Sequence, residues 1–415
     1  MFDTLLRSKP AKALLPLLLL ALLGLGGELW LRLTSAYVSP PQWTFNDAVG
    51  IAYKPQSRPP VVNSFGCIDQ ERTLAKPQGV RRVLLLGDSF VSGRPIAGFL
   101  EKALQAKDPR TRYEVIPLAF AGMGLPGQMA YFETFGKQLQ PDIVVVVVNH
   151  ATIQNTTSLL QAVAFGFDPA TPYMPFYQKI DGPTPQYRKI APVPGSRASA
   201  LLPLPDPRER SIFRRLDKGL DSLLGSLYLY GWLKDAVLKA DTDLQLHGND
   251  AKAAYFLAQL RQNPAYRRDL DGWDYPNDLD MADMFLLPTE ALPKAFQDAV
   301  DITGFLMADL SRQCRDIGAR LTALVTPDCL FIPDWRAKRI ADRNGEKKRA
   351  IDARAYLDKI NGILTAASME RVDLAPAFQA LGVANGYKEN DTHFNETGER
   401  LAADALAGHL LEKTP

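Results

Sequence analysis

The sequence predicts an α/β fold of three layers, with helices on both faces of a five-stranded parallel sheet. Short apolar runs alternate along the chain with longer stretches of helical periodicity, and parallel sheets with crossover helices produce this order. The run at 143–148 contains only Ile and Val. Such β-branched residues favour a strand that is buried on both faces.

The elements follow from these patterns in chain order. The apolar run at 83–86 predicts the first strand, and Ile96, Phe99, Leu100 and Leu104 repeat at helical spacing after it. Further strands are expected at 113–118, 143–148, 320–326 and 371–374. Further helices are expected at 295–314, 353–367 and 396–412.

Five segments are expected along the chain. They are a cytoplasmic tip and transmembrane anchor (1–36), a linker and lead-in loop (37–80), the first part of the core (81–160), a largely helical insertion (161–292) and the second part of the core (293–415). The linker is rich in Pro and polar residues, and Pro is frequent again in the insertion up to Pro207.

The amino-terminal stretch Ala13–Leu33 is almost entirely apolar and as long as the ~20 residues that a membrane helix needs. Arg7, Lys9 and Lys12 precede it, which keeps that end in the cytoplasm. We therefore expect a single-pass protein of the cytoplasmic (inner) membrane, with the remaining chain on the extracytoplasmic, periplasmic side.

Glu28 and Arg32 interrupt the apolar stretch and lie four residues apart, so they can pair on one helix face. A cleaved signal peptide is the alternative to this anchor. It is the weaker interpretation, because Thr34-Ser35-Ala36 is a poor small-x-small cleavage site.

Composition excludes several classes of function. The formal net charge is +2, so the chain lacks the broad basic field of a nucleic-acid-binding protein. Cys67, Cys314 and Cys329 are widely spaced and form no Cys-x-x-Cys pair, which argues against a zinc or dithiol centre. Buried free thiols are expected, with one disulfide as the alternative.

The candidate nucleophile is Ser89 in Gly87-Asp88-Ser89-Phe90, directly after the first strand. Ligands of open α/β sheets bind at the carboxyl ends of strands, and Gly87 permits a tight turn there. Ordinary turns use the same residues, so the tripeptide alone is a weak signal. A serine hydroxyl also needs a base to become a nucleophile.

The chain offers four histidines: His150, His247, His393 and His409. His393 precedes the last predicted helix, and Asp391 lies two residues before it. This carboxylate can orient the imidazole, which makes Ser89, His393 and Asp391 a candidate catalytic triad. The alternative is that Asp391 and Asn395 only cap the helix.

Taken together, the early Gly-Asp-Ser-Phe and the late Asp-x-His-x-Asn resemble blocks I and V of the SGNH (GDSL-like) hydrolases. Val115–Gly124 is similar to block II, whose glycine donates a backbone N–H to the oxyanion hole. Gly122 matches that glycine best, and Gly124 is second. Pro141-Asp142 before the valine strand resembles the approach to block III.

Upstream, Asn63-Ser64-Phe65-Gly66 and Lys76-Pro77 resemble the lead-in of membrane-anchored bacterial members of this family. The resemblance covers residues 60–160 and 293–412. It implies no metal and no organic cofactor.

Two departures stand out. Block III normally ends in Gly-x-Asn-Asp, whereas this chain has Val148-Asn149-His150-Ala151-Thr152. Asn149 is the candidate oxyanion donor and Asn155 a remote substitute. In block V the acid usually lies three residues before the histidine, and here it lies two before. The Asp-x-His form resembles the motif of proteins that acetylate or deacetylate exopolysaccharides. In alginate-type acetyltransferases, however, this motif precedes the serine, whereas here it follows it.

The expected function is that of a serine esterase that removes acyl groups, such as acetyl, from a carbohydrate or cell-envelope polymer. The first alternative is an O-acyltransferase that acetylates an exopolysaccharide or envelope glycan, with a membrane protein as partner. The second is a non-catalytic SGNH domain that serves as a subunit of a membrane complex.

Overall fold

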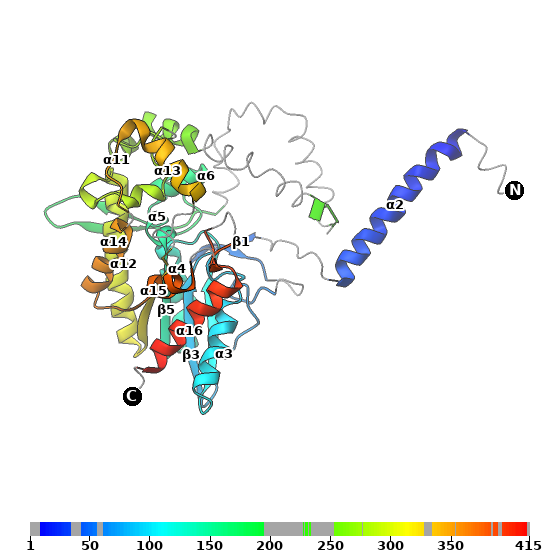
Figure 1. Cartoon of the computed structure of the whole chain (residues 1–415), viewed down its shortest axis with the longest axis horizontal. Coiled ribbons are helices and arrows are strands. Elements are labelled where there is room, and N and C mark those ends of the chain that lie inside the picture. Colours follow the sequence, from blue (N-terminus) through cyan, green and yellow to red (C-terminus); the bar gives the residue numbers. More distant parts are fainter. Residues whose placement is uncertain are drawn as a thin grey trace. The chain divides into compact units, whose positions relative to one another are not determined.

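The structure is a computed structural model (Figure 1). It describes residues 9–34, 43–55, 61–194, 227, 229–230, 232–233, 253–275, 277–327, 334–352, 354–382, 385–388 and 392–412. The chain divides into two compact units. One comprises residues 1–41 and 203–249, and the other comprises residues 42–202 and 250–415.

The larger unit contains the predicted five-stranded sheet. Its strands are β3 (Val80–Gly87), β4 (Arg112–Ala119), β5 (Ile143–Val148), β8 (Arg320–Val325) and β9 (Glu370–Asp373). They pair in the order β4-β3-β5-β8-β9, and every pair is parallel. All carboxyl ends therefore lie at one edge of the sheet.

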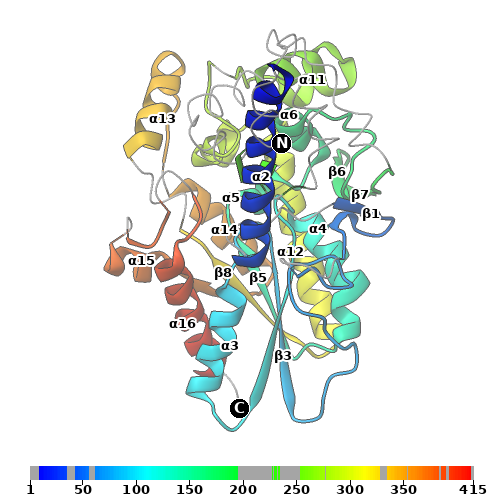
Figure 2. The same ribbon diagram turned by 90° about the vertical axis from the view of Figure 1, so that its right-hand side faces the viewer.

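Helices cover both faces of this sheet, as the sequence predicts. Along β3, Leu84 and Leu86 join one buried cluster, and Val83 and Leu85 join the other. Figure 2 shows α3 (Ile96–Lys107) and α16 (Glu396–Glu412) beside each other, with α12 (Lys294–Asp316) on the other side. The three-layer α/β/α arrangement is confirmed.

The larger unit contains further helices. They are α4 (Leu125–Tyr131), α5 (His150–Gln154), α6 (Ser158–Phe165), α11 (Pro264–Leu270), α13 (Asp334–Lys347), α14 (Ala355–Ala366) and α15 (Ala375–Leu381). Residues 253–262 are also helical. The unit further contains a π-helical turn, η1 (Phe132–Gly136), and the 3₁₀ turns η2 (Lys137–Leu139), η3 (Asp283–Leu286) and η4 (Thr289–Ala291).

Ion pairs hold the amino edge of the sheet. Arg82 is fully buried in β3, and its Nε donates to Glu114 of β4 at 2.9 Å. The Asp142 carboxylate accepts from the backbone N–H of Arg82 at 2.7 Å and from Lys76 Nζ at 2.7 Å. These contacts join the lead-in segment and the start of β5 to β3. They therefore fix the amino end of β3, and Ser89 follows its carboxyl end.

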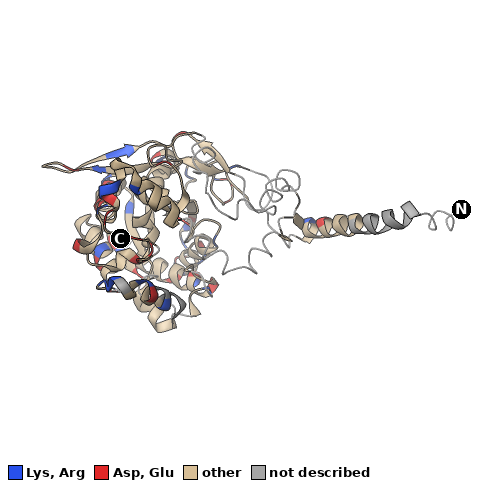
Figure 3. Cartoon of the chain, turned by 90° about the horizontal axis from the view of Figure 1, so that it is seen from above, with Lys and Arg blue, Asp and Glu red and all other residues tan. Residues whose placement is uncertain are grey.

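Two antiparallel hairpins in the described residues are not apparent from the sequence pattern. One pairs β1 (Trp43–Asn46) with β2 (Gly50–Tyr53), inside the segment expected to be a linker. The other pairs β6 (Phe176–Ile180) with β7 (Gln186–Ile190), inside the segment expected to be largely helical. Lys, Arg, Asp and Glu are interspersed along the elements of the larger unit (Figure 3).

The smaller unit contains α2 (Lys9–Thr34). Arg32 Nε donates to the Glu28 carboxylate at 2.6 Å, as their spacing predicts. Among the helices in the described ranges, none combines the length and the apolar character needed to cross a bilayer. The membrane-spanning role of Ala13–Leu33 stays a prediction.

Candidate active site

Ser89 lies in a tight turn at the carboxyl end of β3. The carbonyl of Asp88 accepts from the N–H groups of Val91 and Ser92, at 3.0 and 2.8 Å. A Cβ at Gly87 would lie 2.4 Å from Val91 Cγ2, so this position requires glycine. The turn leaves Ser89 partly exposed at the sheet edge.

His393 reaches the same turn from the loop before α16. Its Nε2 lies 2.7 Å from Ser89 Oγ, within hydrogen-bond distance. The imidazole packs against the Phe90 ring with 4.8 Å between centroids, and Phe394 packs on Phe90 in turn. These aromatic contacts restrict the orientation of the histidine ring.

Asn395 holds the loop that carries His393. Its Nδ2 donates to the carbonyls of Asn385 and Tyr387, at 2.9 and 3.0 Å, and its Oδ1 accepts from the N–H of Gly398 at 3.0 Å. The capping role considered for Asn395 is therefore present, and it stabilises the loop beside the candidate base. Asp391 lies outside the described residues.

Gly122 follows β4, the strand next to β3. Gly87 and Ala119 are partners in the register of the two strands, so Ser89 and Gly122 both follow the carboxyl edge. The Phe120 carbonyl accepts from Met123 N–H at 3.1 Å, and Gly122 has a φ of +77° within this turn. A positive φ at the third position of a turn favours glycine.

The backbone N–H groups of Ser89 and Gly122 form no hydrogen bond with any described residue. They are therefore available to a ligand at the sheet edge. The Gly122 carbonyl, by contrast, accepts from Asn155 Nδ2 at 3.1 Å. Asn155, the remote substitute for an oxyanion donor, thus holds the glycine turn.

Asn149 lies at the end of β5 and caps helix α5. Its Oδ1 accepts from Thr152 N–H at 3.2 Å, and Thr152 Oγ1 accepts from the Asn149 N–H at 3.0 Å. Its Nδ2 lies 3.1 and 2.9 Å from the two oxygens of the Asp88 carboxylate. The side chain of Asn149 is therefore held at both ends.

The contact with Asp88 uses one N–H of the Asn149 amide. The two oxygens of a carboxylate lie too close together to receive both diverging N–H bonds from one nitrogen, so one N–H is shared between them. An amide nitrogen carries two N–H donors. The second N–H has no acceptor among the described residues, and the side chain of Asn149 is fully buried.

Asp88 is the buried carboxylate beside the candidate nucleophile. Burial raises its pKa, while hydrogen bonds from Phe90 N–H and the Asn149 side chain and the charges of His150 and His393 lower it. Sequence reasoning treated Asp88 only as part of the motif. Its position next to a strand that is buried on both faces is the signal that could have identified it.

Arg94 is a second residue that the sequence did not suggest. Its Nε donates to the Ser89 carbonyl at 3.1 Å, and its Nη1 lies 4.0 Å from Glu399 Oε1 in α16. Arg94 therefore joins the nucleophile turn to the helix that follows His393. Nothing in the sequence pattern indicates that these positions lie together, because their contact depends on the fold.

The cysteines and the possible metal ligands do not add to the candidate site. Cys67 and Cys314 are free and buried, and burial raises the pKa of each thiol to about 12. Cys329 lies outside the described residues. Within the described ranges, His, Cys, Asp and Glu do not gather in any group of three or more that could hold a metal ion.

Part of the chain matches a known family. The family model described as the SGNH hydrolase-like domain of acetyltransferase AlgX matches residues 291–415, a segment that contains His393 and α16. No curated protein matches the chain.

Solved structures with a similar arrangement include three enzymes. An acetyl xylan esterase is 11% identical over 79% of this chain and 99% of its own, with a TM-score of 0.36. A lipase/acylhydrolase from Enterococcus faecalis is 9% identical over 80% and 96%, with a TM-score of 0.33. A GDSL-like lipase from Bacteroides thetaiotaomicron is 9% identical over 80% and 89%, with a TM-score of 0.32.

We infer nothing about the reaction from structures this distant. The matched segment, the parallel sheet and the Gly-Asp-Ser turn at its carboxyl edge belong to the chain itself. Residues 291–415 therefore match the SGNH hydrolase-like domain, the family that the sequence motifs resemble.

Proposed function

We propose that this chain is a serine esterase that removes acyl groups, such as acetyl, from a carbohydrate or cell-envelope polymer. The family supports acyl hydrolysis or acyl transfer as the class of reaction. The observation that carries the proposal is the 2.7 Å distance between Ser89 Oγ and His393 Nε2. A nucleophile and its general base need this contact.

In the proposed mechanism, Ser89 Oγ attacks the ester carbonyl and His393 Nε2 takes the hydroxyl proton. The tetrahedral intermediate collapses to an acyl-serine, and His393 returns the proton to the leaving alcohol. Water then attacks the acyl-serine with His393 as base, which releases the acid and restores the serine. Asp391 would hold the imidazole in the required tautomer.

Three donors would stabilise the oxyanion of each tetrahedral intermediate. They are the backbone N–H groups of Ser89 and Gly122 and the second N–H of the Asn149 amide. The first two have no hydrogen-bond acceptor among the described residues. Fixed donors of this kind act where the negative charge develops and need no rearrangement during the reaction.

Hydrolysis of p-nitrophenyl acetate by the full chain tests this proposal. Ser89→Ala and His393→Ala should each lower kcat by at least about 10³-fold while the protein stays folded. Ser92→Ala is the matched control, because Ser92 lies in the same turn and its buried Oγ has no hydrogen-bond partner among the described residues. Equal activity of the wild type and Ser89→Ala would support a non-catalytic domain instead.

Acyl transfer to a glycan is the second candidate, favoured by the acetyltransferase named in the matching family model. The two reactions share the acyl-serine and differ in whether water or a sugar hydroxyl attacks it. Incubation with an acetyl donor and an oligosaccharide separates them by product. A hydrolase releases free acetate, and a transferase yields acetylated oligosaccharide.

We also propose that Ala13–Leu33 anchors the chain in the inner membrane, with the SGNH domain on the periplasmic side. The exposure of Leu22, Leu23, Leu25, Leu29 and Leu33 along α2 supports this location. Protease added outside spheroplasts should digest the SGNH domain. Protection of the domain until the membrane is lysed would contradict the proposed orientation.

A further inference from the structure

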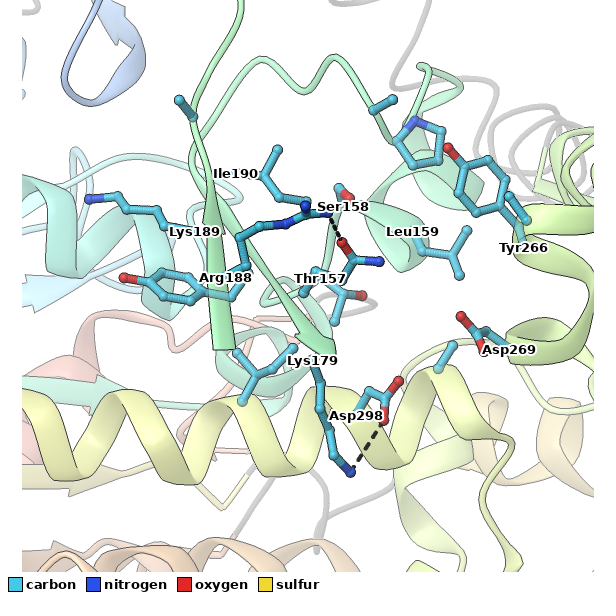
Figure 4. A pocket seen from close by; sticks show the side chains of 18 residues that line it. Thr157, Ser158, Leu159, Lys179, Arg188, Lys189, Ile190, Tyr266, Asp269 and Asp298 are labelled. Carbon is cyan, nitrogen blue, oxygen red and sulfur yellow. Dashed lines mark hydrogen bonds and ion pairs between the residues drawn. The ribbon is translucent and has the colours of Figure 1, made fainter. Parts of the chain in front are cut away.

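A cavity of about 480 Å³ lies in the larger unit, between the β6–β7 hairpin and helices α6, α11 and α12 (Figure 4). Its volume falls within the ~300–1,000 Å³ of typical ligand sites. Its lining includes Ser158 of α6, Arg188 of β7, Tyr266 and Asp269 of α11 and Ile302 of α12. Neither Ser89 nor His393 lines it, so it is separate from the proposed active site.

Arg188 is a cation of this cavity that lacks a carboxylate partner among the described residues. Lys179, which also lines the cavity, lies 3.5 Å from Asp298 and 2.5 Å from Asp301, and Lys189 lies 3.2 Å from Glu133. Arg188 forms no ion pair within the described part of the chain, and its Nη2 donates to Gln178 Oε1 at 2.5 Å. Its charge is therefore available to an anion.

The amino terminus of α6 provides further donors at the same cavity. Thr157 Oγ1 caps the helix by accepting from Leu160 N–H at 3.3 Å. The N–H groups of Ser158 and Leu159 have no acceptor among the described residues. The first N–H groups of a helix carry partial positive charge and favour an anion.

Ser158 adds a side-chain donor. It is only 6% exposed, yet it lines the cavity, and its hydroxyl forms no hydrogen bond with a described residue. The Ser158 oxygen is not among the fully buried atoms that lack a partner, so it can bond to water or to a ligand atom in the cavity.

The hairpin brings Arg188 to this helix terminus. Tyr177 N–H donates to the Thr156 carbonyl at 3.2 Å, which places the start of β6 beside the residue before the α6 cap. Gln178 follows Tyr177 and is the register partner of Arg188. Figure 4 shows Arg188 and Ser158 at the border of the same cavity.

We propose that this cavity binds an oxyanion group, a carboxylate or a phosphate, carried by a larger ligand. The Arg188 guanidinium, the Ser158 hydroxyl and the N–H groups of α6 would bind the oxyanion, since planar guanidinium groups suit both anions. Tyr266 and Ile302 would contact the remainder of the ligand.

The acidic side chains of the cavity do not oppose this assignment. Asp298 is paired with Lys179 and Lys294, the latter at 2.7 Å. Asp269 lies on α11 and is 3.7 Å from Arg268. The proposed position of the anion is at α6 and Arg188, away from the α11 wall.

Calorimetric titration of the full chain at low ionic strength tests the proposal, with glucose 6-phosphate, glucuronate and glucose as probes. Binding of either charged sugar, without comparable binding of glucose, is expected. Glucose 6-phosphate alone would identify phosphate as the preferred group, and glucuronate alone would identify carboxylate.

Arg188→Gln should weaken binding of the charged sugar by about tenfold or more. Ser158→Ala should weaken it by a smaller factor. Arg312→Gln is the matched control, since it removes the same charge from a 58% exposed side chain that does not line the cavity and pairs with no residue of its lining. Hydrolysis of p-nitrophenyl acetate should be unchanged in all three variants, so this test is independent of the esterase proposal.

Three results would overturn the proposal. One is equal binding of glucose and of the charged sugars. Another is an equal effect of Arg188→Gln and Arg312→Gln on binding. The third is absence of binding by either charged sugar up to about 10 mM, a concentration at which even weak sites of millimolar Kd are occupied.

Discussion

Ser89 Oγ lies 2.7 Å from His393 Nε2, although 304 positions separate the two residues in the sequence. The serine follows β3, and the histidine precedes α16. Residues of α3 and α16 share one buried cluster with β3, which brings the loop before α16 back to the carboxyl edge of the sheet. The contact therefore depends on the packing of the whole α/β unit.

Gly122 offers a test of the oxyanion hole. A methyl group at this position would meet no atom within 4 Å, but the φ of +77° strains any other residue. Gly122→Ala should therefore destabilise the protein by about 1–2 kcal/mol, and a shift of its N–H should lower kcat by roughly a further 10-fold. Urea unfolding and ester hydrolysis measure the two effects.

Gly79→Ala is the control for this substitution. Gly79 has a φ of +75°, also faces open space, and precedes β3 at the opposite edge of the sheet. The same loss of stability with unchanged kcat is expected. An equal loss of kcat in both variants would mean that strain, and not the Gly122 N–H, causes the effect.

Asn149 and Asp88 should act as one unit. Asn149→Ala should lower kcat by about 10²–10³-fold, because an oxyanion donor is lost. Asp88→Asn should also lower kcat, since Asn149 loses the carboxylate that orients its amide. The double variant should be little worse than Asn149→Ala alone, because residues in contact are not additive. Additive losses would contradict the coupling.

Asp391 completes the proposed triad. Asp391→Asn should lower kcat by up to about 10⁴-fold with a modest change in KM, since the wrong imidazole tautomer would face Ser89. Asn390→Ala, one residue earlier, should have little effect. Activity that survives Asp391→Asn but falls with Asn390→Ala would place the orienting group three residues before His393.

Lys359 predicts a pH dependence of stability. Its Nζ is buried and donates to the carbonyls of Phe285, Leu287 and Ala355, at 3.1, 2.5 and 3.0 Å. Burial lowers the pKa of this ammonium from 10.5 to about 8. Between these two values the unfolded chain binds more protons than the folded one, so this contribution to stability rises with pH.

The free energy of unfolding should therefore gain about 2 kcal/mol from Lys359 between about pH 7.5 and 9.5. Lys359→Met removes the titrating group, so its stability relative to the wild type should fall across that range. Urea titrations at the two pH values measure the difference. A constant difference would contradict the lowered pKa.

The sheet was predictable from the sequence because burial on both faces leaves a strong pattern. The valine run of β5 and the apolar run of β3 are typical of central parallel strands, and the helices between them follow regular spacing. The β6–β7 hairpin was not apparent, since polar residues such as Lys179 and Arg188 occupy it and its pairing depends on contacts with α6 and α12.

The candidate site was predictable only where a motif carried it. Ser89 and His393 stand out because the chain has few histidines and each residue lies beside an element end. The Asp88–Asn149 contact was not foreseen, because it depends on the adjacency of β3 and β5 in the sheet. The ring contact of Trp43 with Phe120 joins β1 to the Gly122 turn. It was not foreseen either, because it also depends on how distant segments pack in the fold.

Labelling with a fluorophosphonate tests the central proposal most directly, because the probe reacts with a serine that a base has activated. We expect one label per chain, located on Ser89 by peptide mass spectrometry, with a labelling rate that falls by about 10³-fold or more in His393→Ala. A folded wild-type chain that leaves Ser89 unlabelled, or labels it equally fast without His393, would contradict the proposed catalytic serine.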